Sequence, residues 1–185
     1  LDSINRIAQH FPTSYIFQTD FFALLHNCPN EQLYNEATGE VSPTPIRRVA
    51  EKHLKVHLAF KDYYWFRTVE KWQGFSATKD IYFGDRFHGG VVFLQCARPA
   101  VIVYNDARVR ELTDFYGIPA VSPSEVLEND PVALLKAKTG EASLDHFRRT
   151  YLDRLGSFLQ VLRKGGLELF NEAEFDSVLS ARVEV

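Results

Sequence analysis

The residues best suited to chemistry stand together in the stretch FGDRFHGG, residues 83–90. A carboxylate at Asp85, a guanidinium at Arg86 and an imidazole at His88 precede two glycines, and an almost wholly apolar segment follows directly. Arg86 can form paired hydrogen bonds to a phosphate or a carboxylate, and His88 can transfer a proton near neutral pH. This combination indicates a site for a small anionic ligand that undergoes acid–base chemistry.

The elements on either side place this stretch at the edge of a sheet. Residues 79–83 (KDIYF) predict a strand, and residues 88–98 are apolar on all sides, which predicts a buried helix. Residues 84–90 then form a strand-to-helix loop, where the free amides and dipole of the helix N-terminus favour an anion. Gly89 and Gly90 lack a Cβ and are expected to let a ligand approach the backbone closely.

Further polar residues are expected at the same edge. Asp106 and Arg108 follow residues 100–104, an apolar β-branched run typical of a parallel strand covered on both faces. Arg108 is a candidate second anion contact and Asp106 a candidate for orienting a donor or hydroxyl; alternatively, Asp106 caps a helix and Arg108 is solvated. Gln18 and Asp20 end an earlier predicted strand and either join this site or cap a turn.

A purely structural interpretation of the central stretch also remains open. In it, Asp85 and Arg86 form an ion pair and His88 caps the helix that follows. The aromatic cluster within residues 63–75 is a candidate platform for stacking a sugar. Such clusters form cores more often, so a structural interpretation is open here too.

The order of the predicted elements defines the fold class. Strands are expected over residues 14–20, 55–60, 79–83, 100–104 and 118–122, and helices over 45–54, 62–75, 88–98 and 108–117. Strands alternating with helices predict an α/β protein with a Rossmann-like, open, mostly parallel sheet flanked by helices. We assign this domain to residues 1–125 and a helical C-terminal extension, packed on it, to residues 126–185. Sheets of this kind bind ligands beyond the carboxyl ends of their strands.

Local signals fix several helix ends. Thr44 followed by Pro45 predicts a helix start, Ser122 with Glu125 predicts a capping box, and Gly117 predicts a helix end. The C-terminal region carries an apolar stripe at helical spacing, ended by two glycines at 165 and 166. Its members are Leu144, Phe147, Tyr151, Leu155, Phe158 and Leu162.

Composition excludes several classes of protein. The net charge of −3 gives no basic footprint for nucleic acid, and no apolar run reaches the roughly 18 residues that span a bilayer. Cys28 and Cys96 are far apart, which argues against a disulfide framework and favours a reducing, cytoplasmic location. His53 and His57 have the spacing of a zinc pair, but the strand expected at 55–60 would break that helical spacing, so no metal site is predicted.

The segment GDRFHGGVVFLQCARPAVIVYNDARVREL resembles the signature region of the polysaccharide pyruvyl transferase family. That family shows an S/D-R-L/F-H-G run, a buried helix, a turn of a small residue and proline, an apolar strand, and then H-D-x-R-x-x-E-L. The matching positions are Asp85, Arg86, Phe87, His88, Gly89, Pro99, Asn105, Asp106, Arg108, Glu111 and Leu112. Asn105 stands where the family often has His, so no role for that His is carried over. The Q-x-D of Gln18 and Asp20 also resembles a strand end of the family.

The resemblance implies an activity and an architecture. It implies the C-terminal half of a two-domain, GT-B-like enzyme, since this chain is too short to hold both domains comfortably. Such an enzyme moves the enolpyruvyl group of phosphoenolpyruvate onto sugar hydroxyls, forming a ketal in exopolysaccharide or cell-surface glycan synthesis. Arg86 would hold the donor, His88 would supply a proton, and the helix amides would complete the anion cradle.

The same resemblance defines the expected partners. These are phosphoenolpyruvate as the donor substrate and a glycan or lipid-linked sugar as the acceptor, with no metal and no cofactor required. The chain is expected to be cytoplasmic and not transmembrane, and a homo-oligomer is left open. Two other functions remain: a GT-B-type glycosyltransferase in which Arg86 holds the diphosphate of a nucleotide-sugar, and a non-catalytic relative that keeps the loop for folding or partner binding.

Overall fold

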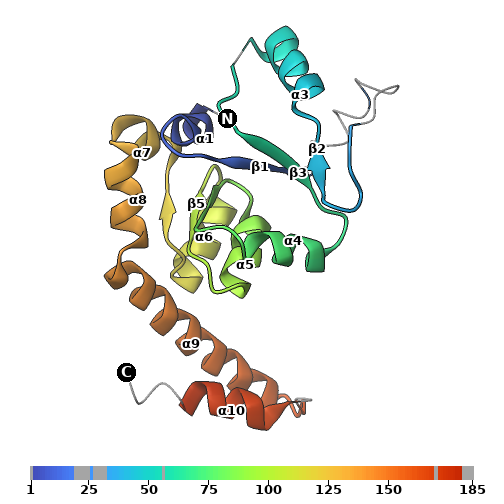
Figure 1. The fold of residues 1–185 in the computed structure, drawn as a ribbon. Coiled ribbons are helices and arrows are strands. Elements are labelled where there is room, and N and C mark those ends of the chain that lie inside the picture. The colour runs from blue at the N-terminus through green and yellow to red at the C-terminus, as the bar shows by residue number, and fades with distance from the viewer. Residues whose placement is uncertain (1, 19–25, 27–32, 56, 169–170, 181–185) are drawn as a thin grey trace.

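The chain folds into two small sheets with flanking helices and a helical C-terminal region that leads away from them (Figure 1). The computed structural model describes residues 2–18, 26, 33–55, 57–168 and 171–180. The α/β class predicted from the alternation of strands and helices is confirmed. Within those ranges, no helix is both long and apolar enough to cross a membrane.

The first sheet is mixed and has the strand order β1-β3-β2. Its strands are β1 (Ser14–Phe17), β2 (Glu40–Val41) and β3 (Asp62–Trp65). β1 runs parallel to β3, with Ser14 opposite Asp62, whereas β2 runs antiparallel to β3. The helices α1 (Asp2–Ala8) and α3 (Pro43–Val49), continued by a π-helical turn η1 (Ala50–Leu54), belong to this half of the chain. Tyr63 and Phe60 are buried at its core.

The second sheet is wholly parallel and has the order β4-β5-β6. It comprises β4 (Tyr82–Gly84), β5 (Ala100–Val103) and β6 (Ala120–Val121), connected through α5 (Phe87–Gln95) and α6 (Ala107–Tyr116). The central strand β5 is buried along its whole length, as its continuous apolar sequence predicts. Gly117 ends α6 in the left-handed conformation (φ 67°), which confirms the predicted helix end.

The C-terminal region consists of α7 (Pro123–Glu128), α8 (Pro131–Thr139), α9 (Glu141–Lys164) and α10 (Glu172–Ser180). Val126 of α7 and Leu135 of α8 share a core cluster with Val101 and Val103 of β5, so both helices pack directly on the parallel sheet. The first part of α9 contacts α6 and α8. Its remainder projects away from the sheets, with α10 beside its far end (Figure 1).

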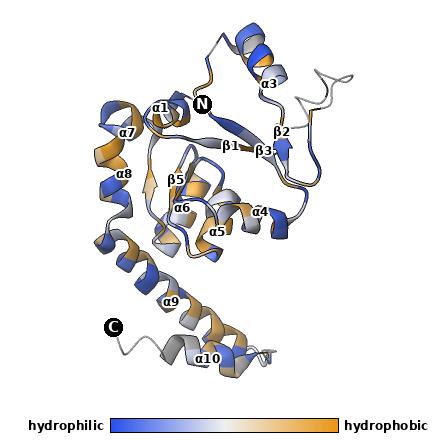
Figure 2. Ribbon diagram, viewed as in Figure 1, coloured by the Kyte–Doolittle hydropathy of each residue, from blue (hydrophilic) through white to orange (hydrophobic). Residues whose placement is uncertain are grey.

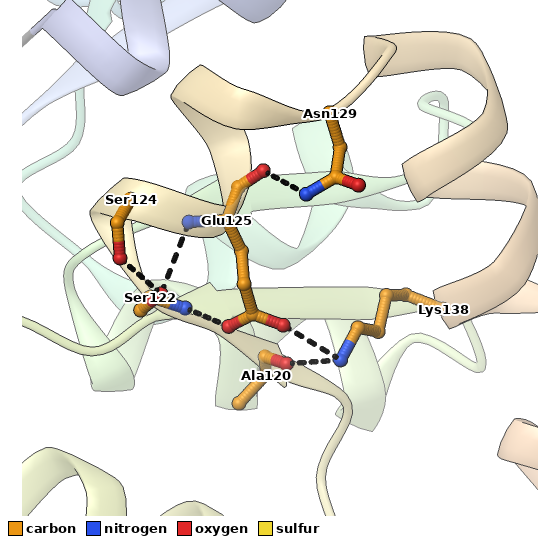
Figure 3. A network of polar contacts seen from close by, with 6 residues as sticks. All are labelled: Ala120, Ser122, Ser124, Glu125, Asn129 and Lys138. Carbon is orange, nitrogen blue, oxygen red and sulfur yellow. Dashed lines mark hydrogen bonds and ion pairs between the residues drawn. The ribbon is translucent and has the colours of Figure 1, made fainter.

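The predicted capping box at the start of α7 is present (Figure 3). The Ser122 hydroxyl accepts a hydrogen bond from the Glu125 amide (3.1 Å), and the Glu125 carboxylate accepts one from the Ser122 amide (2.7 Å). These bonds, helped by Lys138, hold the pKa of Glu125 below its ordinary value. Lys138 of α8 also donates to the carbonyl of Ala120 in β6 (2.8 Å). These contacts link α8 to β6.

The strand predicted over residues 55–60 is wrong. Lys55, directly after η1, is in the left-handed conformation, and residues 57–60 form no strand. Their backbone polar groups bond to a distant side chain: Asn5 donates to the His57 carbonyl (3.0 Å) and accepts from the Ala59 amide (2.9 Å). Because Asn5 occupies those backbone groups, this segment does not need a neighbouring strand.

The helix predicted over residues 62–75 is also wrong in its first half. Asp62 does not cap a helix but begins β3, whose aromatic residues suit a strand paired on both sides. The helix α4 (Val69–Ser76) starts only after Thr68, whose hydroxyl accepts from the Lys71 amide at 3.5 Å. The start predicted at Thr44 is shifted as well, because α3 begins at Pro43 after Ser42.

Candidate functional site

The candidate site is formed by two carboxyl-edge loops, residues 85–88 after β4 and residues 104–108 after β5. Because β4 and β5 are parallel neighbours, both loops leave the sheet at the same edge. The Asn105 amide nitrogen donates to a carboxylate oxygen of Asp85 at 3.2 Å. The expected meeting of these two stretches is therefore confirmed.

Arg86 occupies the N-cap position of α5, with extended backbone (φ −97°, ψ 107°). No side chain caps this helix end. The Arg86 Nε atom lies 3.9 Å from the nearest Asp85 carboxylate oxygen, beyond hydrogen-bonding distance, and the Arg86 side chain is 53% exposed. An exposed pair of this kind contributes at most about 1 kcal/mol, so the guanidinium remains available for an anion from solution.

Tyr82 supports the loop that carries Arg86, a role that the sequence interpretation missed. Its hydroxyl donates to the Arg86 carbonyl at 2.9 Å. Burial raises the pKa of Tyr82 well above its ordinary value, and the nearby Asp85 carboxylate raises it further. The phenol therefore stays protonated and continues to donate. The signal in the sequence was a tyrosine four residues before Arg86, within the same strand–loop unit.

Gly89 and Gly90 are buried against the protein interior. A Cβ atom on Gly89 would lie 2.7 Å from the Tyr82 ring, and one on Gly90 would collide with the Ile102 side chain. The need for glycine at both positions is thus explained by packing against the sheet. Their expected role in letting a ligand approach the backbone stays a prediction.

His88 lies exposed in the first turn of α5. Its side chain does not cap the helix; the Gly89 amide bonds instead to the Arg86 carbonyl (3.0 Å). The capping alternative for His88 is therefore not realised. Its imidazole is open to solvent two residues along the chain from Arg86.

Asp106 and Arg108 have the arrangement of the structural alternative, in which Asp106 caps a helix and Arg108 is exposed to solvent. The Asp106 carboxylate accepts from the Val109 amide at 2.8 Å and so caps α6. Arg108 is exposed and forms no ion pair with any residue that the structure describes. It can therefore still serve as an anion contact, whereas Asp106 is engaged by the helix it caps.

A groove of about 580 Å³ runs along the edges of the two sheets, lined by β1 on one side and β4 on the other. Three of the predicted site residues, Gln18, Asp85 and Arg86, line it together. Five others do not line it: His88, Gly89, Gly90, Asp106 and Arg108. Asp20 falls outside the described residues. Cavities of this volume hold ligands of drug size.

The remainder of the groove has an aromatic wall with one cation, Lys79, beside it. Trp72 and Phe75 of α4 line the groove, and the Lys79 ammonium lies 4.6 Å from the Phe75 ring centroid. Trp72 Nε1 is buried and has no hydrogen-bond partner among the described residues. Part of the aromatic cluster predicted as core or sugar platform thus faces a cavity, while Tyr63 is core.

Nothing in the described ranges gathers three or more histidine, cysteine, aspartate or glutamate side chains into a group able to hold a metal ion. His53 lies in η1, and His57 follows the left-handed Lys55. The two histidines therefore do not stand one turn apart on a single helix.

Comparison of the chain with protein-family models, with curated proteins and with solved structures found no match in any of the three. The chemistry of the site is therefore inferred from its residues and their geometry.

Proposed function

We propose that this chain is the donor-binding domain of a pyruvyl transferase, which holds phosphoenolpyruvate at the carboxyl-edge loops and passes its enolpyruvyl group to sugar hydroxyls. The observation that carries the proposal is the position of Arg86. Arg86 lines the groove, its Nε atom lies 3.9 Å from the Asp85 carboxylate, and the residue stands at the N-terminus of α5, which no side chain caps. A cation and free helix amides at one point form an anion site.

The strand order supports a Rossmann-like interpretation of the fold. One sheet begins with β1 and the other with β4, and both of these edge strands line the groove. Outward from β4 the order is β4-β5-β6, as in one half of a doubly wound sheet, whereas the other sheet has the order β1-β3-β2 with β2 antiparallel. In doubly wound sheets ligands bind beyond the carboxyl ends of the strands, where Gln18, Asp85 and Arg86 lie.

The proposed reaction assigns one task to each free side chain. Arg86 holds the phosphate or carboxylate of the donor through two N–H groups, and Arg108 neutralises the second anionic group. His88 protonates the methylene carbon, which becomes a methyl group. Two sugar hydroxyls form the two new C–O bonds of the ketal while the C–O bond to phosphate breaks. One hydroxyl proton returns to His88 and the other leaves with the phosphate or solvent.

The groove favours a second candidate function, a glycosyltransferase that uses a nucleotide-sugar. Its volume of about 580 Å³ exceeds what phosphoenolpyruvate fills, and Trp72 and Phe75 offer faces on which a base or sugar ring can stack. In that case Arg86 would hold the diphosphate. Both functions use the same anion site. They differ in the rest of the ligand, which is small in phosphoenolpyruvate and includes a base and sugars in a nucleotide-sugar.

A thermal-shift titration separates the ligand classes. Wild type, Arg86→Ala and the control Arg148→Ala are each titrated with phosphoenolpyruvate and with a panel of nucleotide-sugars. Arg148 is an exposed arginine on α9, paired with Asp145 and remote in sequence from both carboxyl-edge loops. A ligand at 100 times its dissociation constant stabilises by about 2.7 kcal/mol.

The proposal predicts stabilisation by phosphoenolpyruvate that Arg86→Ala abolishes and Arg148→Ala leaves intact. Stabilisation by a nucleotide-sugar alone would assign the chain to the glycosyltransferase class. No stabilisation by any ligand would contradict both enzymatic functions for this chain and support the non-catalytic alternative.

A further inference from the structure

The groove that Arg86 lines extends along β4 to the opposite edge of the parallel sheet. Lys79, which comes before β4, and Pro99, which comes directly before β5, line it as well. Because β4, β5 and β6 are parallel, the residues that precede these strands share one edge, the amino edge, whereas Arg86 follows β4 at the carboxyl edge. The groove therefore has a second end, here called the amino end, which the proposed donor site does not use.

A lysine of α8 belongs to the amino end. Lys138 donates to the carbonyl of Ala120, the first residue of β6, so the last turn of α8 lies near the amino edge. Lys136 stands in the same turn, is exposed and lines the groove. Lys138 is paired with Glu125, whereas Lys136 forms no ion pair with any residue that the structure describes. The Lys136 ammonium is therefore available for an anion.

Lys79 adds a second cation to the amino end. Its ammonium lies 4.6 Å from the Phe75 ring centroid, so it rests on an aromatic ring and not on a carboxylate. Two acids also line the groove. Asp85 lies at the carboxyl edge, and the exposed Asp80 forms an ion pair with neither lysine of the amino end. With two unpaired cations and one acid, the amino end favours an anionic group.

The groove is apolar along β4. Phe11, Ile81 and Phe83 pack against a buried core cluster, yet each stays partly exposed, and all three line the groove. Val132 is 37% exposed, lines the groove and stands one turn before Lys136, so an apolar and a cationic side chain share one face of α8. Figure 2 shows hydrophobic and hydrophilic residues side by side on this helix. The lining thus matches a ligand with an apolar body and one anionic end.

We propose that the groove binds an amphiphilic anion, a molecule with one anionic head group and a single hydrocarbon chain. The head group lies at the amino end with Lys136 and Lys79, and the chain lies along β4. A cavity of about 580 Å³ with a mainly apolar lining and a few charged groups has the character of a preformed ligand site. This inference does not rest on the proposed transferase activity, since neither lysine belongs to the carboxyl-edge loops.

Calorimetric titration with a series of alkyl phosphates tests the chain and the head group. Ethyl, hexyl and decyl phosphate are titrated into the full chain, each below the concentration at which it forms micelles. The dissociation constant should fall about fourfold for each CH2 group that becomes buried, equivalent to about 0.8 kcal/mol. Decyltrimethylammonium, which has the same chain and a cationic head group, should bind at least tenfold more weakly than decyl phosphate.

Val132→Gln tests the apolar wall without adding a charge beside Lys136. Because the side chain is 37% exposed, the variant should fold, which an unchanged circular dichroism spectrum checks. It should raise the dissociation constant of decyl phosphate several-fold and leave that of ethyl phosphate unchanged, because a polar amide replaces an apolar contact with the chain. The matched control is Val69→Gln on α4. That valine is 52% exposed, does not line the groove and should be silent for both ligands.

Lys136→Ala and Lys79→Ala test the head group. Each should weaken decyl and ethyl phosphate by the same factor, roughly threefold to tenfold, with a smaller effect in high salt. Lys164→Ala, an exposed lysine in the last turn of α9, is the control and should change neither. Arg86→Ala should leave decyl phosphate binding intact, and Lys136→Ala should leave phosphoenolpyruvate binding intact. Failure of this inference is therefore distinguishable from failure of the proposed donor site.

Any one of four results would overturn the inference. Decyl phosphate might not bind at millimolar concentration, or ethyl and decyl phosphate might bind equally, and either result would exclude the apolar subsite. Equal binding of decyltrimethylammonium and decyl phosphate would exclude an anionic head group. Loss of decyl phosphate binding in Arg86→Ala, but in neither Lys136→Ala nor Lys79→Ala, would place the head group at the carboxyl edge instead.

Discussion

The Asn105 side-chain amide donates to the Asp85 carboxylate at 3.2 Å and links the two carboxyl-edge loops. The bond has a consequence for the neighbouring cation. It holds one carboxylate oxygen of Asp85 toward the β5 loop, while the other oxygen stays 3.9 Å from Arg86 Nε. We infer that Asn105 keeps Asp85 from neutralising Arg86.

Asn105→Ala should therefore weaken donor binding more than it weakens folding. Without the amide, Asp85 is free to close on Arg86 and compete with the anionic ligand. One exposed hydrogen bond contributes about 0.5–1.5 kcal/mol to stability, whereas we expect the dissociation constant for phosphoenolpyruvate to rise roughly tenfold, equivalent to about 1.4 kcal/mol. Calorimetric titration measures the binding and thermal unfolding measures the stability.

Asn129→Ala is the matched control, because the exposed Asn129 side chain makes a similar hydrogen bond (2.7 Å, to the Glu125 carbonyl) away from these loops. It should leave the dissociation constant unchanged. Equal dissociation constants for Asn105→Ala and wild type would show that Asp85 does not compete with the ligand for Arg86.

Packing of the buried face of α5 against β4 gives a prediction about stability. Gly89→Ala places a Cβ atom 2.7 Å from the Tyr82 ring, so either the ring or the helix must move. Overpacking of this kind costs about 1–3 kcal/mol. Because Tyr82 also bonds to the Arg86 carbonyl, movement of the ring should weaken donor binding too.

Gly74→Ala provides the comparison for that variant. A Cβ on Gly74, inside α4, has no atom within 4 Å. Alanine there should raise stability by about 0.5–1 kcal/mol, since it restricts the unfolded chain and favours the helix. Urea unfolding of the two variants should shift the midpoint in opposite directions, and a shift in the same direction would contradict the packing role of Gly89.

The capping box of α7 makes stability depend on pH. Hydrogen bonds from Ser122 hold the pKa of Glu125 below its value in the unfolded chain, about 4.3. A lowered folded-state pKa contributes stability that is complete above the unfolded pKa and is lost as the pH falls through the folded pKa. Glu125→Gln should therefore cost most at neutral pH and progressively less as the pH falls below about 4.

The measurement is the free energy of unfolding in urea at pH 7 and at pH 3 for wild type, Glu125→Gln and Glu128→Gln. Glu128 is an exposed glutamate on the same helix. Glutamine can still accept the hydrogen bond from the Ser122 amide, so Glu125→Gln removes only the contribution of the charge and should cost less at pH 7 than the about 0.5–2 kcal/mol of a lost N-cap. A Glu125→Gln penalty that is the same at both pH values would exclude the proposed linkage.

The sequence predicted those features that depend on neighbouring residues. The capping box needs only Ser122 and Glu125, the end of α6 needs only Gly117, and the buried strand β5 is a local apolar run. The position of the Asp85 and Asp106 loops at one edge followed from parallel neighbouring strands. Each of these rests on local chemistry or on a general rule of sheet geometry.

Features that depend on residues far apart in the chain were not predictable. The segment 55–60 has the composition of a strand, but Asn5, more than 50 residues earlier, takes up its backbone groups. The aromatic run at 62–65 became a strand because β1 and β2 pair with it. The packing role of Gly89 depends on Tyr82, and the groove is lined by β1 and β4, which lie more than 60 residues apart in the chain.

The most direct test of the account is a calorimetric titration of phosphoenolpyruvate into wild type, Arg86→Ala and His88→Ala. Hydrogen bonds to charged groups contribute about 1.5–3 kcal/mol, so Arg86→Ala should weaken binding at least tenfold. His88→Ala should bind within about threefold of wild type, because the proposed role of His88 is proton transfer and not donor binding. Equal dissociation constants for wild type and Arg86→Ala would contradict the central claim that Arg86 forms the donor site.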